Sequence, residues 1–310
     1  MKKIFLILAI ITISLTLFSQ QDAMYTHYMF NTLSVNPAYA GSRDALTLTG
    51  LHRSQWVGFD GAPRTQTLTL HTPLMNESLG VGFSVVNDKI GPTNTTALYG
   101  DFAYKIKLTE TSKLALGLSA GLNIRRNALI DIPLEQQEDI AFYRNEESNL
   151  LPNFGFGVYY SIHNKFYAGI SIPKLIENNF SNIDTRYNTK LNSESRHYFL
   201  IAGVIFDLTE NVKFKPTMLT KYTNGAPLEG DITATLLYKE KLWGGLMYRT
   251  GDAFGLLLGF YFTPQLAAGY SFDWSFGNKT MAYNKGSHEI MLMYDFIWKD
   301  KARIRSPRYF

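Results

Sequence analysis

Apolar and polar residues alternate along the segment from Lys113 to Arg125, KLALGLSAGLNIR. Every even position carries leucine, alanine or isoleucine, and every odd position carries a small or polar residue. Successive side chains of a β-strand point to opposite faces, so this segment predicts a strand with one apolar and one polar face. It is longer than the ~5–6 residues of a usual globular strand and fits the ~9–11 tilted residues that cross a bilayer.

The same alternation recurs along the rest of the chain, bounded by turn residues. It predicts about fourteen strands, including the one above. They are Asp44–Arg53, Arg64–Thr72, Ser78–Asn87, Thr95–Lys107, Lys113–Arg125, Asn153–Ile162, Lys165–Ile172, Arg196–Leu208, Val212–Tyr222, Leu228–Tyr238, Lys241–Thr250, Phe254–Phe262, Gln265–Trp274 and Gly286–Trp298.

The connections between these strands differ in length according to their parity. The even-numbered connections are all tight: Leu74–Glu77, Leu108–Ser112, His163–Asn164, Thr209–Asn211, Lys239–Glu240 and Thr263–Pro264. All long connections are odd-numbered: Ser54–Pro63, Asp88–Asn94, Arg126–Pro152, Pro173–Ser195 and Ser275–Lys285. Two other odd ones, Thr223–Pro227 and Gly251–Ala253, are short. Transmembrane barrels have short periplasmic turns and long surface loops, so we expect an all-β, antiparallel up-and-down barrel.

The N-terminal residues Met1–Ser19 have the form of a secretory signal peptide, with Lys2 and Lys3 before an apolar core. We expect cleavage near residue 19 or 20. After Phe18 no apolar run approaches the ~18 residues of a spanning helix. Because only helices and closed barrels satisfy their backbone in lipid, the mature chain is either a soluble exported protein or an outer-membrane barrel. The strand pattern favours the barrel, with its wall at residues 44–298.

Two segments lie outside the predicted wall. Residues 20–43 form either a periplasmic lead-in or a plug in the lumen. The strands' polar faces are rich in Gly and Thr and leave room for a plug, which would use Tyr28, Phe30, Asn36, Pro37 and Tyr39. Residues 299–310 form a basic tail, predicted to be periplasmic, whose candidate contact residues are Lys301, Arg303, Arg305 and Arg308.

Composition agrees with a membrane barrel. Of 310 residues, 14% are aromatic and only 18% are charged. The net charge of +4 implies no nucleic-acid partner, and the absence of cysteine excludes disulfides and thiolate sites. Several aromatic residues fall near strand ends, as in the girdles at lipid interfaces, although β-propensity alone also enriches strands in aromatics. They are Tyr104, Tyr160, Trp243, Tyr248, Trp274, Tyr294 and Trp298.

The first long connection is the strongest candidate contact site. It contains Gln55, Trp56, Val57, Gly58, Phe59, Asp60, Gly61 and Pro63. Aromatic side chains on a Gly-rich loop are typical of partner-binding hot spots. Gly and Pro at this density also fix backbone shape. Two interpretations therefore stay open: a partner-binding tip, or a loop that positions the first hairpin.

No motif points to catalysis, a cofactor or a metal. The six histidines show no HExxH spacing, and the acidic stretch within Arg126–Pro152 matches no EF-hand pattern. Ser287, His288 and Asp295 have the residue types of a hydrolytic triad. Ser287 and His288 are adjacent on one predicted strand, however, so their side chains face opposite sides and cannot pair directly. We expect a protein that is not an enzyme.

Several blocks along the chain resemble the PorP/SprF family of outer-membrane proteins of the type IX secretion system. The blocks that carry the resemblance are YMFN…NPAYAGSR at Tyr28–Arg43, QWVGFDGAPRTQTL at Gln55–Leu68, NDKIGPT at Asn87–Thr93, YGDFAYKIKL at Tyr99–Leu108, PNFGFGVYY at Pro152–Tyr160, FKPTMLTKYTNGAPLEGD at Phe214–Asp231, FTPQLAAGYSFDW at Phe262–Trp274, GSHEIMLMYDF at Gly286–Phe296 and SPRYF at Ser306–Phe310.

This resemblance implies an integral outer-membrane protein of the secretion and gliding machinery. Such a protein helps to export or tether a partner, an adhesin-like surface protein with a C-terminal sorting domain, or contacts the periplasmic ring and lipoprotein components. The alternative is a passive channel or hydrophobic-solute transporter of the same architecture. The motifs do not separate the family's branches or identify a cargo.

Overall fold

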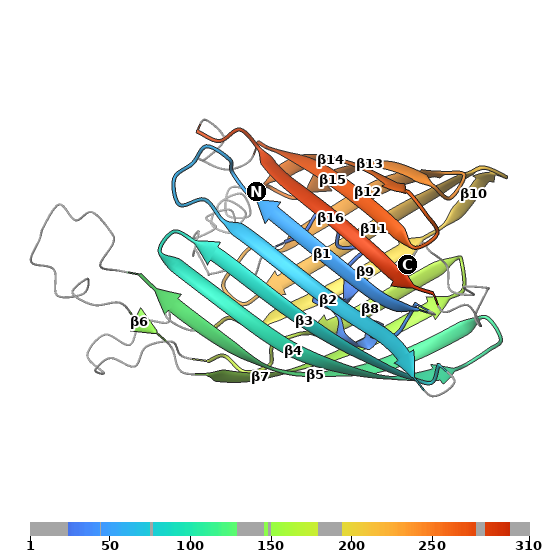
Figure 1. The fold of residues 1–310 in the computed structure, drawn as a ribbon, viewed down its shortest axis with the longest axis horizontal. Coiled ribbons are helices and arrows are strands. Elements are labelled where there is room, and N and C mark those ends of the chain that lie inside the picture. The colour runs from blue at the N-terminus through green and yellow to red at the C-terminus, as the bar shows by residue number, and fades with distance from the viewer. Residues whose placement is uncertain are drawn as a thin grey trace, which may run out of the picture.

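A computed structural model describes residues 24–43, 45–74, 77–128, 146–147 (backbone), 150–178, 194–276 and 283–297. These residues form an antiparallel barrel with a wall of fourteen strands (Figure 1). The strands are β1 (Leu46–Ser54), β2 (Arg64–Leu74), β3 (Leu79–Ile90), β4 (Thr93–Lys107), β5 (Ser112–Asn127), β6 (Glu146–Glu147), β7 (Leu151–Ile162), β8 (Phe166–Ile172), β9 (His197–Val204), β10 (Phe206–Thr209), β11 (Val212–Thr223), β12 (Glu229–Tyr238), β13 (Leu242–Arg249), β14 (Ala253–Tyr261), β15 (Leu266–Ser275) and β16 (Ser287–Phe296).

The sixteen strands make fourteen wall strands for two reasons. β6 pairs only with the end of β5. β9 and β10 are one wall strand interrupted at Ile205, and both pair with β11. The predicted strand count is confirmed, with boundaries within a few residues.

The barrel closes by pairing its first strand with its last. β1 and β16 are antiparallel and in register from Leu46 opposite Phe296 to Ser54 opposite His288. Each other wall strand pairs with its neighbours in the chain, so the sheet is a meander. Within the described residues, closure leaves the fourteen-stranded wall without a free edge, which is what a lipid environment demands of a β-structure.

The side chains alternate between lipid and lumen. On β5, Leu118 is 60% exposed, and its cross-strand neighbours Phe102 and Phe156 are exposed beside it. The next residue, Ser119, is 7% exposed and points inward. The predicted apolar face of the 113–125 segment is thus the outer surface of the barrel, as expected of a strand that crosses a membrane.

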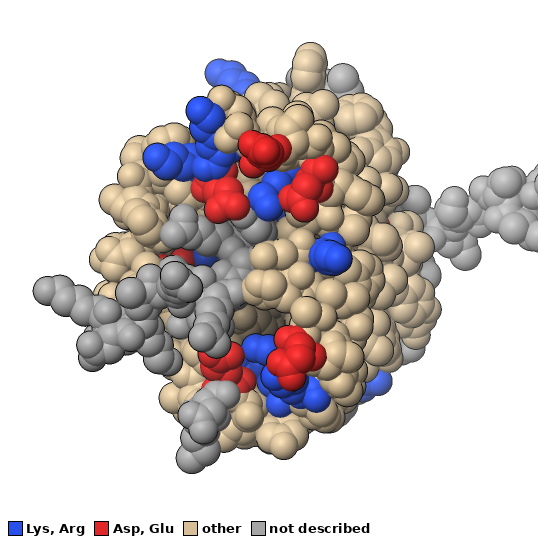
Figure 2. Space-filling model, turned by 90° about the vertical axis from the view of Figure 1, so that its right-hand side faces the viewer, with Lys and Arg blue, Asp and Glu red and all other residues tan. Residues whose placement is uncertain are grey.

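The two ends of the barrel differ. At one end, called here the short-turn end, neighbouring strands are joined by tight turns that carry ion pairs such as Lys107–Glu110 and Lys113–Glu77. Figure 2 views this end and shows acidic and basic side chains gathered at the rim. The opposite, long-loop end carries the long connections. By the general rule for such barrels, the short-turn end faces the periplasm.

The wall is taller on one side. β4 and β5 have 15 and 16 residues, whereas β13 and β14 have 8 and 9. The tall side extends at the long-loop end, where β6 adds to β5 (Figure 1).

The helical content of the described residues is two short 3₁₀ turns, Thr32–Ser34 and Pro37–Tyr39. Among these residues no helix has the length and apolar character needed to cross a membrane.

Candidate functional site

The lumen of the barrel is occupied by the chain's own N-terminal part. The segment Met24–Arg43, called here the lumen segment, contains both 3₁₀ turns. Nearly all of its side chains are buried, and Tyr28, Asn36 and Ala38 are completely inaccessible. The sequence was compatible with either a periplasmic lead-in or a plug in the lumen. In the structure, the described residues of this segment lie inside the barrel.

Glycines on the inner face of the wall make room for the lumen segment. A Cβ atom on Gly80 of β3 would lie 2.0 Å from the carbonyl oxygen of Ala40. On Gly117 of β5 it would lie 2.1 Å from the Ala38 nitrogen. No real Cβ approaches backbone so closely, so the second 3₁₀ turn requires glycine at these wall positions.

Gly157 of β7 completes this contact. A Cβ there would lie 2.1 Å from Oδ1 of Asn36. The same Oδ1 caps the second 3₁₀ turn by accepting from the Ala38 N–H at 2.9 Å, while Nδ2 donates to the Val158 carbonyl at 3.1 Å. Asn36 therefore joins the turn to the wall. We call Gly80, Gly117 and Gly157 the glycine cradle.

The lumen segment is anchored at the short-turn end by charged groups. Arg43 donates to Asp295 of β16 at 2.6 Å, and Thr47 donates to the same carboxylate at 2.7 Å. Both members of the ion pair are almost fully buried. The backbone of Gly41 adds two contacts, because its N–H donates to His71 and its carbonyl accepts from Lys105.

A second anchor lies toward the long-loop end. The backbone N–H groups of Thr26 and His27 donate to Glu289 of β16 at 2.9 and 2.7 Å. Arg53 of β1 reaches Glu289 at 3.3 Å and Asp273 of β15 at 2.7 Å. The lumen segment thus runs from the long-loop end at Thr26 to the short-turn end at Arg43.

Aromatic packing fills the space between the anchors. Tyr39 makes an edge-to-face contact with Tyr159, with ring centroids 5.5 Å apart. Phe30 packs against Trp243 at 5.0 Å. Trp243 is 1% exposed, so of the two interpretations offered for the aromatic residues the lipid-interface girdle is wrong for this one. Its neighbour Leu242 faces outward instead, because strand alternation places adjacent residues on opposite sides.

The other girdle residues divide into two groups. Tyr104, Tyr248 and Trp274 are exposed on the outer surface, Trp274 at 68%. Tyr160 and Tyr294 are half-buried, and Trp298 lies outside the described residues.

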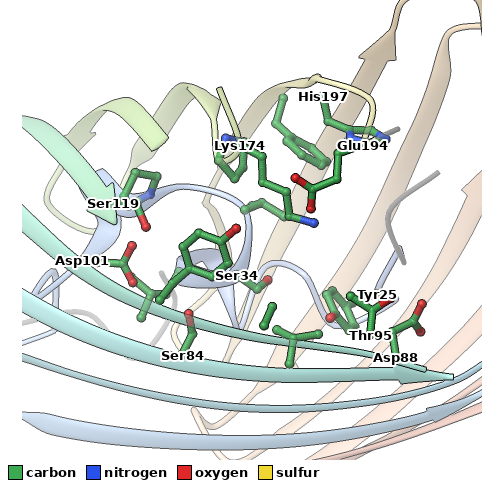
Figure 3. A pocket seen from close by; sticks show the side chains of 18 of the residues that line it. Tyr25, Ser34, Ser84, Asp88, Thr95, Asp101, Ser119, Lys174, Glu194 and His197 are labelled. Carbon is green, nitrogen blue, oxygen red and sulfur yellow. The ribbon is translucent and has the colours of Figure 1, made fainter. Parts of the chain in front are cut away.

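A cavity of about 160 Å³ remains between the lumen segment and the tall side of the wall. Tyr25 and Ser34 line it from the lumen segment, and Ser84, Asp101 and Ser119 line it from β3, β4 and β5 (Figure 3). Its opposite side includes residues next to the ends of β8 and β9. Because the lining extends to the last residues of β3, the cavity opens toward the long-loop end.

The loop Gln55–Pro63 is held by its neighbours on both sides. Val57 exchanges backbone hydrogen bonds of 2.8 and 2.7 Å with Gly286 and Lys285. The carbonyl of Gly61 accepts from Gly91 in the β3–β4 turn at 2.9 Å. Trp56, which has a φ of 47°, donates its N–H to Ser287 Oγ at 3.1 Å.

The apex of this loop remains exposed. Val57 and Phe59 are 36% and 44% accessible, and Gly58, Asp60 and Gly61 are also exposed. Gln55 and Trp56 are half-buried, and Pro63 is buried where β2 begins. The loop therefore combines a fixed base with an accessible apolar tip.

A family model described as "Type IX secretion system membrane protein PorP/SprF" matches residues 17–294. The chain belongs to the PorP/SprF family. Localisation in the outer membrane follows from this family and from the barrel fold. A comparison with curated protein sequences finds no match.

A solved structure agrees with this PorP/SprF protein in fold. The CymD monoaromatic hydrocarbon channel is 12% identical, with a TM-score of 0.50, over 91% of this chain and 95% of that one. The Acinetobacter baumannii outer membrane protein Omp33 is 11% identical, with a TM-score of 0.47, over 83% and 100%. At this identity the similarity concerns the barrel architecture.

The residues of the superficial triad do not meet in this PorP/SprF barrel. Ser287 faces the lumen, whereas His288 faces outward and its Nδ1 lies 2.7 Å from the hydroxyl of Tyr270. Asp295 is near the other end of β16, bound to Arg43. The described residues contain no group of three or more His, Asp or Glu side chains arranged to hold a metal.

Some predicted positions cannot be placed. Residues 299–310, with Lys301, Arg303, Arg305 and Arg308, lie outside the described residues, as do residues 1–23 and most of the acidic loop. Sequence reasoning noted the small residues of the polar strand faces but not the glycine cradle or Asp101. Glycines at inward-facing positions of neighbouring strands were the available signal for the cradle.

Proposed function

We propose that this protein is a plugged barrel that acts in type IX secretion by holding a secreted surface protein at its long-loop end. The observation that carries the proposal is the occupied lumen: Met24–Arg43 is anchored at both ends and fits the glycine cradle. A lumen filled in this way serves poorly as a route for cargo. The partner that fits the family is a surface protein with a C-terminal sorting domain, such as an adhesin.

The loop Gln55–Pro63 is the contact site that we propose for this partner. Its base is bound to both neighbouring connections, so its tip loses little conformational freedom when a partner binds. Val57 and Phe59 offer exposed apolar surface at the long-loop end, and aromatic anchors of this kind dominate interface energetics.

The other end of the barrel supports a second set of contacts. Ring or lipoprotein components of the secretion machinery are the proposed partners there, with the basic residues Lys301, Arg303, Arg305 and Arg308 as contacts for acidic surfaces. Outer-membrane lipid covers the apolar outer face, and a role in gliding follows if the tethered protein is a motility adhesin.

Gene deletion with complementation tests the tether. Cells without the gene are expected to lose a surface protein into the medium, and the wild-type gene restores its display. A Val57→Asp/Phe59→Asp variant should restore the barrel in the membrane but not display. The matched control is Leu242→Asp/Trp274→Asp on the outer face, which should reduce the amount of barrel itself. Unchanged display of all surface proteins in the deletion strain contradicts the proposal.

The alternative is a passive channel for hydrophobic solutes. One observation favours it: the cavity beside the lumen segment opens toward the long-loop end, in a fold shared with the CymD monoaromatic hydrocarbon channel. Planar-bilayer recording and solute-uptake assays discriminate the two functions, because only a channel conducts or takes up solute in the absence of a partner.

A further inference from the structure

A carboxylate lies at the deep end of the cavity without a cationic partner. Asp101 of β4 is 7% exposed and stands opposite Ser119 of β5 in the strand register. The Ser119 hydroxyl hydrogen-bonds to the carboxylate, but its Oδ2 atom has no hydrogen-bond partner, and no described residue forms an ion pair with it. Figure 3 shows Asp101 beside Ser119 at one end of the cavity, with Asp88 at the other end.

The other charged groups that line the cavity balance one another. Asp88 and Glu194 carry negative charge, and Arg125 and Lys174 carry positive charge. Glu194 is also satisfied by amide donors, since Asn123, Asn153 and Asn178 all donate to it. Asp88 accepts from Thr65 at 2.6 Å. The carboxylate of Asp101 is therefore the uncompensated charge of the lining.

We propose that this cavity binds a ligand that presents a single amine or guanidinium group to Asp101. Burial of an unpaired carboxylate is costly, and a bound cation with N–H donors removes that cost. Tyr25, Ser84 and Ser119 line the same cavity, and their hydroxyl oxygens keep lone pairs that can accept further N–H groups. The site does not rest on the tethering function, because a free small amine can also fill it.

The absence of cysteine in the native chain allows a direct electrostatic test. A Ser84→Cys variant places one thiol in the cavity, and its rates of reaction with cationic and anionic methanethiosulfonate reagents are measured on intact cells. The ratio of cationic to anionic rates should fall about tenfold when Asp101→Asn is added, because the local charge sets the concentration of charged reagent.

Two controls accompany this test. Asp60→Asn removes the same charge from the exposed loop tip and should leave the ratio unchanged. Ser271→Cys places a fully buried thiol in the lumen away from the cavity and should not react. An equal ratio with and without Asp101 overturns the proposal.

Ligand protection gives a second test that keeps Asp101 intact. Millimolar n-butylguanidinium should slow maleimide labelling of Ser84→Cys, whereas the neutral isostere n-butylurea should not. Equal protection by both compounds overturns the cation site. A lysine or arginine side chain of a surface protein and a free small amine share this chemistry. Surface display in the Asp101→Asn strain distinguishes them. Display falls only if the cation belongs to the surface protein.

Folding is monitored by the heat-modifiable gel shift of each variant. If Asp101→Asn fails to fold, the protection experiment alone decides. If the deletion strain keeps all its surface proteins on display while n-butylguanidinium still protects Ser84→Cys, the proposed function is contradicted but the cation site is supported.

Discussion

At the scale of single residues, position along a strand decides which solvent a side chain meets. Leu118 and Ser119 are adjacent in the chain, but one faces lipid and the other faces the cavity. In a soluble domain, a row of apolar residues on one face of a strand marks the protein core. In this barrel it marks the outer surface.

The pair Leu118 and Ser119 provides the first prediction. Leu118→Lys should destabilise the barrel by about 2–4 kcal/mol, the cost of a lipid-facing lysine near the bilayer midplane. Ser119→Lys should be tolerated, because its amine enters a polar cavity close to Asp101. Urea midpoints of the heat-modifiable form in detergent micelles or liposomes measure both, and equal losses contradict the inside–outside assignment.

The glycine cradle provides the second prediction. Gly117→Ala places a methyl group against the backbone of Ala38, and overpacking of this kind costs about 1–3 kcal/mol. The lumen segment should become susceptible to added protease, as seen on immunoblots. Gly100→Ala is the matched control: its Cβ points outward and meets only a backbone oxygen 3.9 Å away. Equal protease resistance in the two variants argues against a tight fit.

At the scale of elements, the lumen segment depends on the wall for its shape. Its two 3₁₀ turns are three residues each, too short to persist without partners. Wall contacts with β3, β5 and β7 and the anchors on β1, β15 and β16 hold it in place. The lumen segment and wall therefore belong to one cooperative unit.

The anchor at the short-turn end gives the third prediction. Arg43→Met leaves Asp295 buried without its cation, and breaking a buried ion pair by removing one partner costs about 3–5 kcal/mol. The temperature of the heat-modifiable shift should fall. Restoring neutrality with Arg43→Met/Asp295→Asn should recover part of the loss, whereas Lys107→Met, in an exposed pair, should have little effect. A double variant no better than the single one contradicts this assignment.

At the scale of the whole molecule, the barrel is a closed wall around an occupied lumen. The wall satisfies its backbone by meandering pairing and by the β1–β16 closure. The cavity lies beside the taller side of the wall, which β4 and β5 form. The accessible internal surface is therefore found where the strands are longest.

The occupied lumen gives the fourth prediction. The intact protein should show no steady conductance in planar bilayers, because the lumen segment fills the path. Deleting residues 24–43, with the signal sequence retained, should produce open channels, while Gly117→Ala should produce intermittent openings. A steady conductance of the intact protein favours the channel function instead.

The sequence by itself determined the fold and the face of most strand residues. Alternation with a period of two depends only on local strand geometry. In a meander whose first and last strands end on the same side, every second connection lies at the same end of the barrel, so long and short connections alternate. The candidate loop Gln55–Pro63 was likewise visible as aromatics among turn residues, but its hydrogen bonds to Lys285 and Gly91 were not.

Only the tertiary structure decided what occupies the lumen. Whether the N-terminal residues enter the barrel depends on pairs far apart in the chain, such as Arg43 with Asp295 and Ala38 with Gly117. The inward position of Trp243 and the unpaired carboxylate of Asp101 are of the same kind. Local patterns specify strands and faces, whereas the curvature and closure of the wall bring these distant residues together.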